Sequence, residues 1–449
     1  MLFRKIESYI CDFLKSDSNK ILVVDGARQI GKSYIIRSVG KRLFKNFIEL
    51  NFVEDLQGPR LFQNISTVED FYFAVSTIYG DKMKNKEDTL IFLDEIQVYP
   101  QLITLLKFLK QDDRYTYVAS GSLLGVTLAD TGSIPIGSIE IKRMYQLDFE
   151  EFLIANGFSR SAIDALEKKF SARESLDDAM HQKLLDLFKK YLIVGGLPDC
   201  VNEFLKTRNV MNIRKIQADI IGFYGEDASK YDKERKLKIK RIYDMLPSTM
   251  QNTKKRVVIK DIEGVQGKRF ANYADEFDYL ISSGIALDVK AISNPVFPLC
   301  QSADKNLLKL YMNDVGLLSG LLYQNNTKPI LEDVRSINLG ALYETAVAGQ
   351  LKALGHRLFY YDNRKNGEVD FLIDDFSSLA VLPLEIKSGR DYTIHSALNH
   401  FVANDSYPVK EGLVLSNERE IKTVGKITYL PIYFVMFLKP MDESSPILL

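Results

Sequence analysis

Residues 22–33 read LVVDGARQIGKS, and this stretch decides how the first part of the chain folds. The apolar run at 21–24 predicts a buried strand, and the sequence at 33–45 predicts a helix. Between them stands Gly-x-x-x-x-Gly-Lys-Ser at 26–33, the P-loop pattern in the strand–turn–helix context that it requires. A glycine-rich turn that carries a lysine by chance is the weaker interpretation, because pattern and context agree. The stretch therefore predicts a nucleoside triphosphate site.

The loop residues have separate expected roles. Glycines let backbone N–H groups turn inward around phosphate oxygens, and the N-terminus of the following helix attracts the same anion. Lys32 is expected to reach the β- and γ-phosphates, and the Ser33 hydroxyl to bind Mg²⁺. The predicted nucleotide-binding residues of the loop are Gly26, Ala27, Arg28, Gln29, Ile30, Gly31, Lys32 and Ser33.

A second apolar run ends in two acids. Residues 89–95, TLIFLDE, predict a buried parallel strand with Asp94 and Glu95 at its carboxyl end. Asp94 is the expected carboxylate for Mg²⁺, and Glu95 is the expected base that orients and polarises the attacking water. Without a P-loop upstream, the pair would be interpreted as two solvated acids. With the P-loop, it predicts hydrolysis, and ATP is favoured because the sequence has no guanine-binding Asn-Lys-x-Asp element.

Composition excludes several classes of protein. The 449 residues include 59 Lys/Arg and 59 Asp/Glu, so only the distribution of charge can indicate a partner. Three cysteines lie far apart without a Cys-x-x-Cys pair, which argues for free thiols in a reducing compartment and against a zinc site. No apolar run approaches the roughly 18 residues of a membrane span. The N-terminus has an amphipathic helical pattern unlike a signal peptide. We therefore expect a cytoplasmic protein without a membrane partner.

Patterning divides the chain into four expected domains. In residues 1–150, strands at 21–24, 47–52, 89–94 and 115–119 alternate with helices, which predicts a three-layer α/β domain with a parallel sheet. Residues 151–226 carry helix-period sequence and predict an all-α lid on the nucleotide. Residues 227–325 predict helices followed by a two-stranded ribbon, as in a winged helix, and residues 326–449 return to mixed α/β sequence.

The winged-helix-like segment is locally basic. Residues 230–269 hold 13 Lys/Arg against 5 Asp/Glu. The helix at 269–283 occupies the recognition position, before the two strands. Because such units place basic side chains against phosphates, residues 230–283 and the C-terminal domain are expected to contact DNA. A solvated basic face on a connecting domain is the alternative.

A second set of charged residues lies in the last block. A helix at 338–354 carries Glu344, one strand carries Asp370, and the next carries Glu385 and Lys387, which at two residues apart share a face. Glu344, Asp370 and Glu385 are the predicted ligands of Mg²⁺ or Mn²⁺. Asp370, Glu385 and Lys387 are the predicted catalytic residues of phosphodiester cleavage, with a metal-activated water as nucleophile. A half-exposed sheet edge with salt-bridged acids is the alternative.

With both sets in view, the chain resembles a family of prokaryotic ATP-binding proteins that join an AAA-type ATPase core to a C-terminal domain of unknown function 4143. The resemblance covers nearly the whole chain. Its motifs, in order, are GARQIGKS (26–33), FLDEIQ (92–97), ASGSLLG (119–125), LDFEEFL (147–153), YLIVGGLPD (191–199), LYMNDVGLL (310–318), GALYETAVAGQL (340–351) and GEVDFLI…PLEIKSG (367–389). It implies an α/β protein with an AAA-type P-loop core, a helical lid, a winged-helix segment and a restriction-endonuclease-like, PD-(D/E)xK, C-terminal domain.

The resemblance also implies residue roles. Ser122 falls near the polar sensor that contacts nucleotide at the end of the fourth strand, and Asp370, Glu385 and Lys387 match the nuclease-like triad, with Glu344 as its helix acid.

One position departs from the family pattern. Many relatives have Gly-Arg before the LDFEEFL-type segment, with an arginine suited to act on a neighbouring subunit's nucleotide. Here Gly137 and Ser138 stand at that place, while Lys142 and Arg143 are close but out of register. The departure argues against activation in trans and against a hexameric ring, and it leaves the oligomeric state open.

Three functions are compatible with these patterns. The first is an ATP-dependent enzyme on DNA whose C-terminal domain is a metal-dependent nuclease, with ATP and Mg²⁺ as cofactors. The second is an ATP-dependent conformational switch that binds DNA or a protein while its nuclease-like domain is inactive. The third is a remodeller of proteins, whose basic stretch binds acidic partners.

Overall fold

A computed structural model of the chain describes residues 2–16, 18–122, 137–227, 233–252, 254–264, 267–304, 307–334, 337–389 and 392–441. The chain forms two compact units. The first comprises Met1–Tyr145 with Asp278–Gly284, and the second comprises Gln146–Phe277 with Ile285–Leu449. Residues 123–125 of the ASGSLLG motif and residues 230–232, 253 and 265–266 of the basic stretch lie outside the described residues.

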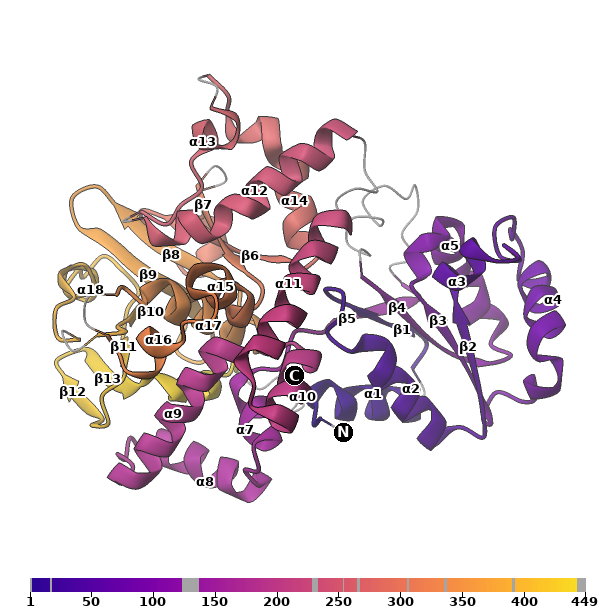
Figure 1. The fold of residues 1–449 in the computed structure, drawn as a ribbon, viewed down its shortest axis with the longest axis horizontal. Coiled ribbons are helices and arrows are strands. Elements are labelled where there is room, and N and C mark those ends of the chain that lie inside the picture. Colours follow the sequence, from indigo (N-terminus) through magenta and orange to yellow (C-terminus); the bar gives the residue numbers. More distant parts are fainter. Residues whose placement is uncertain are drawn as a thin grey trace. The chain divides into compact units, whose positions relative to one another are not determined.

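The first unit contains a five-stranded parallel sheet (Figure 1). Its spatial order is β2-β3-β4-β1-β5. The strands are β1 (Ile21–Asp25), β2 (Asn46–Asn51), β3 (Thr89–Asp94), β4 (Thr116–Gly121) and β5 (Ile139–Arg143). The four strands predicted from the sequence are confirmed to within two residues at each end, and β5 joins them beside β1.

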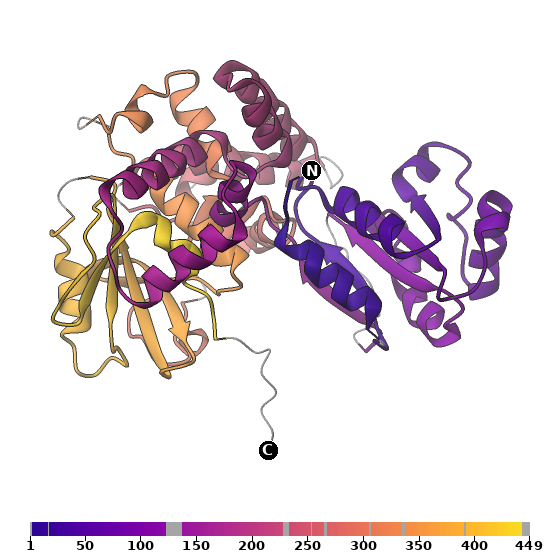
Figure 2. The same cartoon turned by 90° about the horizontal axis from the view of Figure 1, so that it is seen from below.

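Successive residues of a strand point to opposite sides of the sheet. Helices cover both of these faces (Figures 1 and 2). Ile21 and Val23 of β1 belong to the apolar core shared with α4 (Val68–Tyr79) and α5 (Pro100–Asp112). Helix α2 (Lys32–Leu43) packs on the other face, where a Cβ added at Gly40 would lie 2.5 Å from Phe47. Helix α1 (Lys5–Lys15) lies beside α2. The predicted three-layer α/β domain is confirmed.

The second unit begins with helices. They are α7 (Phe149–Ala155), α8 (Arg160–Ser171), α9 (Asp178–Val194), α10 (Pro198–Thr207) and α11 (Val210–Asp227). The prediction that this segment is all-α is therefore confirmed, while its role as a lid stays a prediction.

An eight-stranded mixed sheet forms the rest of the second unit, in the order β12-β13-β11-β10-β9-β8-β6-β7. Its strands are β6 (Ala286–Ile292), β7 (Leu308–Met312), β8 (Phe359–Asn363), β9 (Gly367–Asp375), β10 (Ala380–Ile386), β11 (Gly412–Ser416), β12 (Lys422–Val424) and β13 (Ile427–Pro431). The helices of this part of the chain are α12 (Lys233–Gln251), α13 (Ile259–Glu263), α14 (Ala274–Ser282), α15 (Val315–Tyr323), α16 (Lys328–Leu331), α17 (Gly340–Ala353) and α18 (Ser396–Val402), and α14 belongs to the first unit from Asp278 onward.

The winged-helix-like segment contributes strands to this sheet. Three helices precede the antiparallel pair β6 and β7, in the predicted order. Strand β6 also pairs in parallel with β8, with Ala291 opposite Tyr360. The expected boundary at residues 325 and 326 therefore falls within one continuous sheet, and the winged-helix assignment stays a prediction.

Several sequence motifs meet in the second unit through buried polar contacts. Asp314 caps α15 by accepting from the backbone N–H of Gly316 at 2.9 Å, and its other oxygen accepts from Gly196 N–H at 2.7 Å. A Cβ at Gly195, which has φ +74°, would lie 2.0 Å from Asp314 Oδ1. The YLIVGGLPD and LYMNDVGLL motifs thus pack against each other, with Asp314 of one motif in contact with Gly195 and Gly196 of the other.

The three cysteines Cys11, Cys200 and Cys300 are free thiols, as predicted. In the described part of the chain, no helix combines the length and the apolar character that crossing a membrane demands.

Candidate functional site

The P-loop connects the carboxyl end of β1 to α2, and its backbone depends on glycine at two positions. Gly26 has φ +146°, and a Cβ there would lie 2.3 Å from the carbonyl oxygen of Met144. Gly31 is the N-cap of α2 with φ +92° and ψ +21°, the left-handed region that glycine adopts without strain. Gln29 is also left-handed, at φ +63°. The predicted strand–loop–helix context is therefore present, and the first N–H groups of α2 follow the loop directly.

Lys32 is buried and turned back onto its own loop. Its Nζ donates to the carbonyl oxygens of Gly26 and Ala27, each at 2.8 Å. Burial lowers the pKa of Lys32 below its ordinary value, although Glu95 and Asp25 oppose that shift. Both acceptors are carbonyl oxygens of the loop that would surround the phosphates. The ammonium can therefore exchange these carbonyl oxygens for phosphate oxygens.

Ser33 and Asp94 lie in direct contact. The Ser33 hydroxyl donates to Asp94 Oδ1 at 2.8 Å, and the Ser120 hydroxyl donates to the same oxygen at 2.5 Å. Burial raises the pKa of Asp94, and the two hydroxyl donors partly offset that rise. The two predicted Mg²⁺ ligands thus come together from α2 and β3. Their donor set consists of oxygens, which fits the ligands that Mg²⁺ prefers.

Glu95 follows β3 in a left-handed conformation, with φ +56° and ψ +48°. Its Oε2 accepts from the Ser122 hydroxyl at 2.8 Å and from the Gln97 amide. Burial alone would raise the pKa of Glu95, but the charge of Lys32 and these two donors outweigh it, and the net shift is downward. Glu95 is therefore held ionised beside the P-loop lysine, as proton acceptance from a water requires.

Ser122 and Arg28 complete this group. Ser122 comes directly after β4, and Arg28 Nε donates to its hydroxyl at 3.3 Å. The residues predicted separately from the P-loop, the acid pair and the fourth strand thus form one continuous network at the carboxyl edge of the sheet.

Three further residues support the site and were missed by the sequence analysis. Arg4 is buried and donates to the carbonyl oxygens of Ile30, within the P-loop, and Tyr145, at 2.9 and 2.5 Å. Gln97 and Ser120 orient Glu95 and Asp94. A polar serine within the apolar strand at 116–121 was a signal for Ser120, whereas nothing near Arg4 in the sequence indicated its partner.

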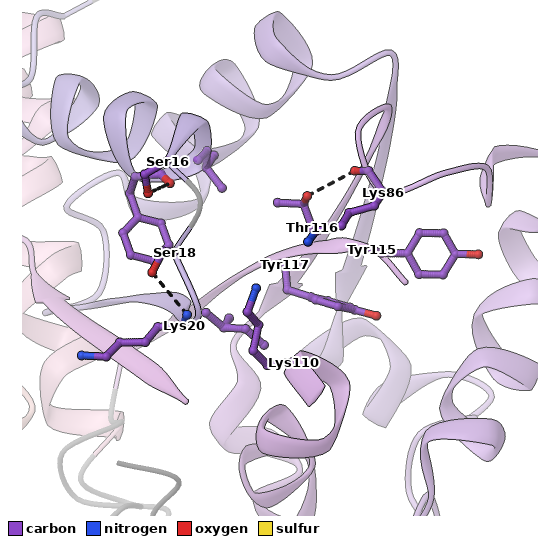
Figure 3. A pocket seen from close by; sticks show the side chains of 11 residues that line it. Ser16, Ser18, Lys20, Lys86, Lys110, Tyr115, Thr116 and Tyr117 are labelled. Carbon is purple, nitrogen blue, oxygen red and sulfur yellow. Dashed lines mark hydrogen bonds between the residues drawn. The ribbon is translucent and has the colours of Figure 1, made fainter. Parts of the chain in front are cut away.

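A small pocket in the same unit lies at the opposite edge of the sheet (Figure 3). The residues that line it include Lys20, directly before β1, Tyr117, near the amino end of β4, and Lys110, in the last turn of α5. The P-loop follows the carboxyl end of β1, so this pocket is separate from the nucleotide site.

Gly137 and Ser138, which stand where many relatives have Gly-Arg, also lie at that opposite edge of the sheet. The carbonyl oxygen of Ser138 accepts from Ile21 N–H at 2.8 Å, at the amino ends of β5 and β1. Arg143 ends β5 beside the P-loop strand, with its Nε 4.0 Å from Asp25 Oδ2. Ser138 therefore contributes no cation to the nucleotide site of its own unit.

The second predicted set lies in the eight-stranded sheet and its helix α17. Asp370 on β9 accepts from the backbone N–H of Ile386 at 2.8 Å. Glu385 is buried on the neighbouring strand β10, and Lys387, one residue beyond the strand, donates to Glu385 Oε1 at 2.8 Å. Burial raises the pKa of Asp370 well above its ordinary value, and the charges of Glu344 and Glu385 raise it further. The structure therefore brings these residues to one region of the second unit.

Protein cations already contact these acids. Lys255 forms an ion pair with Glu344 Oε1, and Tyr311 donates to Glu344 Oε2 at 2.9 Å. Nearby, the fully buried Lys309 pairs with Glu368 at 2.5 Å. No group of three or more His, Cys, Asp or Glu side chains is placed to hold a metal ion in the described ranges. In this arrangement the acids do not fit a metal centre, and their role as metal ligands stays a prediction.

Several cations of the basic stretch form ion pairs where its side chains are described. Lys240 pairs with Asp244, Arg241 with Glu263, and Arg256 with Asp362, at 2.8, 3.7 and 3.3 Å. Helix α14, within the expected recognition position, exposes Asp275 and Asp278. The exposed charge of α14 is thus negative, which disfavours contact with DNA phosphates through this helix.

The fold and the P-loop network define a P-loop ATPase fold of the α/β class, which supports ATP binding. Residues 18–153 match the family model described as an AAA domain, AAA_14. Residues 339–435 match the domain of unknown function 4143, and residues 185–328 match the domain of unknown function 8612. The chain therefore joins an AAA domain to a C-terminal domain of unknown function 4143, as the sequence motifs indicated. No curated protein is detectably similar to it.

Several solved structures are distantly similar. The Walker-type ATPase PABY2304 of Pyrococcus abyssi is 13% identical, with 72% of this chain and 96% of that chain covered and a TM-score of 0.43. The Aeropyrum pernix ORC1 protein in complex with DNA is 14% identical, with 71% and 92% covered and a TM-score of 0.31. The Thermotoga maritima RuvB Holliday junction branch migration motor is 14% identical, with 64% and 89% covered and a TM-score of 0.30.

Proposed function

We propose that the protein hydrolyses ATP at the P-loop and uses the reaction to change the state of its second unit. The contact between Ser33 and Asp94, with an ionised Glu95 next to it, is the observation that carries the proposal. Ser33 and Asp94 would hold Mg²⁺, which when bound neutralises charge on the β- and γ-phosphates.

The residues divide the chemistry among them. Lys32 leaves the carbonyl oxygens of its loop and donates to the phosphates as the negative charge of the transition state develops. Glu95 orients a water and takes its proton, while the water oxygen bonds to the γ-phosphorus and the bond to the leaving ADP oxygen breaks. Ser122 and Gln97 keep the Glu95 carboxylate in place.

Two substitutions test this assignment. Lys32→Ala is expected to abolish nucleotide binding, measured by titration with a fluorescent ATP analogue. Glu95→Gln is expected to keep binding but to lower the turnover number by about 10²–10⁴, the usual size of a general-base contribution. Normal hydrolysis by Glu95→Gln would show that Glu95 is not the base.

The state of the C-terminal domain distinguishes two versions of this function. In one, the domain is a PD-(D/E)xK-like nuclease in which Asp370, Glu385 and Lys387 cut DNA. In the other, the domain binds a partner without cleaving it, and ATP hydrolysis resets the complex. The ion pairs of Glu344 with Lys255 and of Glu385 with Lys387 favour the second version, because both carboxylates already have a cation.

Incubation of the full chain with labelled single- and double-stranded DNA, Mg²⁺ or Mn²⁺, and with or without ATP decides between them. The switch predicts no cleavage under any condition. Cleavage that disappears in Lys387→Ala would establish the nuclease version.

DNA is the partner that we propose for the basic stretch, with α12 rather than α14 as the contacting helix. Helix α12 presents Lys238, Lys240 and Arg241, whereas α14 exposes acids. Binding of fluorescent DNA should weaken steeply with salt, as phosphate contacts require. Replacing Lys240 by Glu should weaken binding, and replacing Asp275 by Asn should not. Absence of DNA binding at low salt would favour a protein partner.

A further inference from the structure

We propose that Lys255 is an internal counter-cation, which takes the place of a divalent metal ion at Glu344, Asp370 and Glu385. The proposal rests on the switch version of the proposed function, in which the C-terminal domain does not cleave. It concerns what keeps the predicted metal ligands from binding metal, and it involves only residues of the second unit.

The contact between Lys255 and Glu344 joins a half-buried lysine to a buried carboxylate. Relative exposure is 15% for the Lys255 side chain and 4% for that of Glu344. The ion pair therefore places the Lys255 ammonium directly against one of the three predicted metal ligands.

The remaining charges show why a cation is needed at this position. Lys387 neutralises Glu385, and Lys309 neutralises Glu368. Without Lys255, the Tyr311 hydroxyl would be the one donor left to Glu344 among the described residues, with the carboxyl of Asp370 near it. A buried carboxylate without a counter-charge is costly, so the site would take up either a proton or a metal ion.

A second observation indicates that the cluster can accept a further cation. Glu385 Oε2 is buried and has no hydrogen-bond partner among the described residues. Such an orphaned carboxylate oxygen next to Asp370 is a ligand atom that a divalent ion would use and that the lysines leave unsatisfied. Removal of Lys255 would therefore leave the Glu344 oxygen that it contacts and the unpartnered Glu385 oxygen as donors for an added metal ion.

Metal binding by nucleotide-free full-length protein tests this inference. Isothermal titration with Mn²⁺ compares the wild type with Lys255→Met, which keeps the aliphatic stem but removes the charge. We expect Lys255→Met to bind one additional Mn²⁺ per chain, at least tenfold more tightly than any Mn²⁺ bound by this region of the wild type. Adding Glu344→Gln to Lys255→Met should abolish the additional site.

Lys254→Met is the matched control, because Lys254 is the exposed neighbour of Lys255 and its charge is equal. It should bind Mn²⁺ as the wild type does. Thermal unfolding gives a second readout: Lys255→Met should melt at a lower temperature than the wild type, and Mn²⁺ should restore it by binding the folded state. Lys255→Gln repeats both measurements if Lys255→Met does not fold.

The proposal is overturned if a folded Lys255 variant binds no more Mn²⁺ than the wild type. It is also overturned if the wild type binds Mn²⁺ as tightly as Lys255→Met does and Glu344→Gln abolishes that binding. ATP turnover by Lys255→Met is a separate measurement on the first unit. Normal turnover together with unchanged metal binding would reject the role of Lys255 and leave the ATPase proposal standing.

Discussion

The Ser33 hydroxyl donates to Asp94 Oδ1 at 2.8 Å, and this bond joins the first turn of α2 to the end of β3. The two residues are 61 positions apart in the sequence. Their contact places a P-loop hydroxyl and a strand-end carboxylate where one ion can bind both. Several measurements follow from this contact and from the network around it.

Removal of the Ser33 hydroxyl should weaken the binding of Mg²⁺ that the ATPase requires. Ser33→Ala is expected to raise the Mg²⁺ concentration for half-maximal hydrolysis by roughly 10–100-fold, the usual cost of losing a group that supports a metal site. Ser33→Thr keeps the hydroxyl and should stay close to the wild type. Equal Mg²⁺ dependence in Ser33→Ala would remove Ser33 from the site.

Ser122→Ala should change the pH profile of turnover as well as its maximum. The pKa of Glu95 is lowered overall: burial raises it, but Lys32 and the donors Gln97 and Ser122 outweigh burial. Since the base works ionised, activity is lost as pH falls through the pKa of Glu95. Losing one donor raises that pKa, so the acidic limb of the kcat profile should move to higher pH. An unchanged limb would mean that Ser122 does not act through Glu95.

Arg4→Met should loosen the P-loop without removing any group that contacts phosphate. Arg4 donates to the carbonyl oxygen of Ile30 at 2.9 Å, and two carbonyls would lose their donor. We expect a loss of about 1–3 kcal/mol in the stability of the first unit, the cost of buried unsatisfied polar groups. The KM for ATP should rise while kcat stays near that of the wild type. A fall in kcat alone would contradict this positioning role.

Asp314→Asn should remove a pH dependence from the stability of the second unit. Burial raises the pKa of Asp314 to about 6, although backbone donors such as Gly196 N–H oppose the shift. Between the ordinary value of 3.8 and about 6, the folded chain keeps a proton that the unfolded chain has released. The free energy of unfolding therefore falls as pH rises through that window, by roughly 3 kcal/mol at about 1.4 kcal/mol per pKa unit.

Urea unfolding of wild type and Asp314→Asn at pH 4.5 and pH 7 measures this difference. The variant loses a buried acceptor for Gly196 N–H, so it should be less stable than the wild type at pH 4.5. Its deficit should shrink by pH 7, where the wild type carries the buried charge. A deficit that does not change with pH would show that Asp314 does not titrate in this range.

Local patterns were sufficient for the nucleotide site. The P-loop is contiguous, and the acid pair ends a strongly apolar strand, so residues 26–33, 94 and 95 could be assigned without knowing which strands are neighbours. The pairing of β3 with β4 then brings Ser122 to Glu95. Parallel sheets gather the carboxyl ends of their strands at one edge, which is why residues predicted from separate strands lie together here.

Long-range partners could not be predicted. The ion pair between Lys255 and Glu344 joins residues 89 positions apart, and Arg4 reaches Tyr145 across 141 positions. Nothing in either local sequence favours one partner over any other residue of opposite charge or any other carbonyl. The acids of α14 were visible in the sequence, however, and the excess of lysine and arginine in the surrounding stretch masked them.

The pairing of β6 with β8 also affects how the second unit is made. A ribosome synthesises residues 286–292 before residues 359–363, so at about 5–20 residues per second one edge of β6 has no partner for several seconds. An open strand edge is a template for pairing with other chains. A chain that ends near residue 325 would keep that edge open permanently. The residues after 325 therefore supply the strand that completes the pairing of β6, and a chain without them has an incomplete sheet.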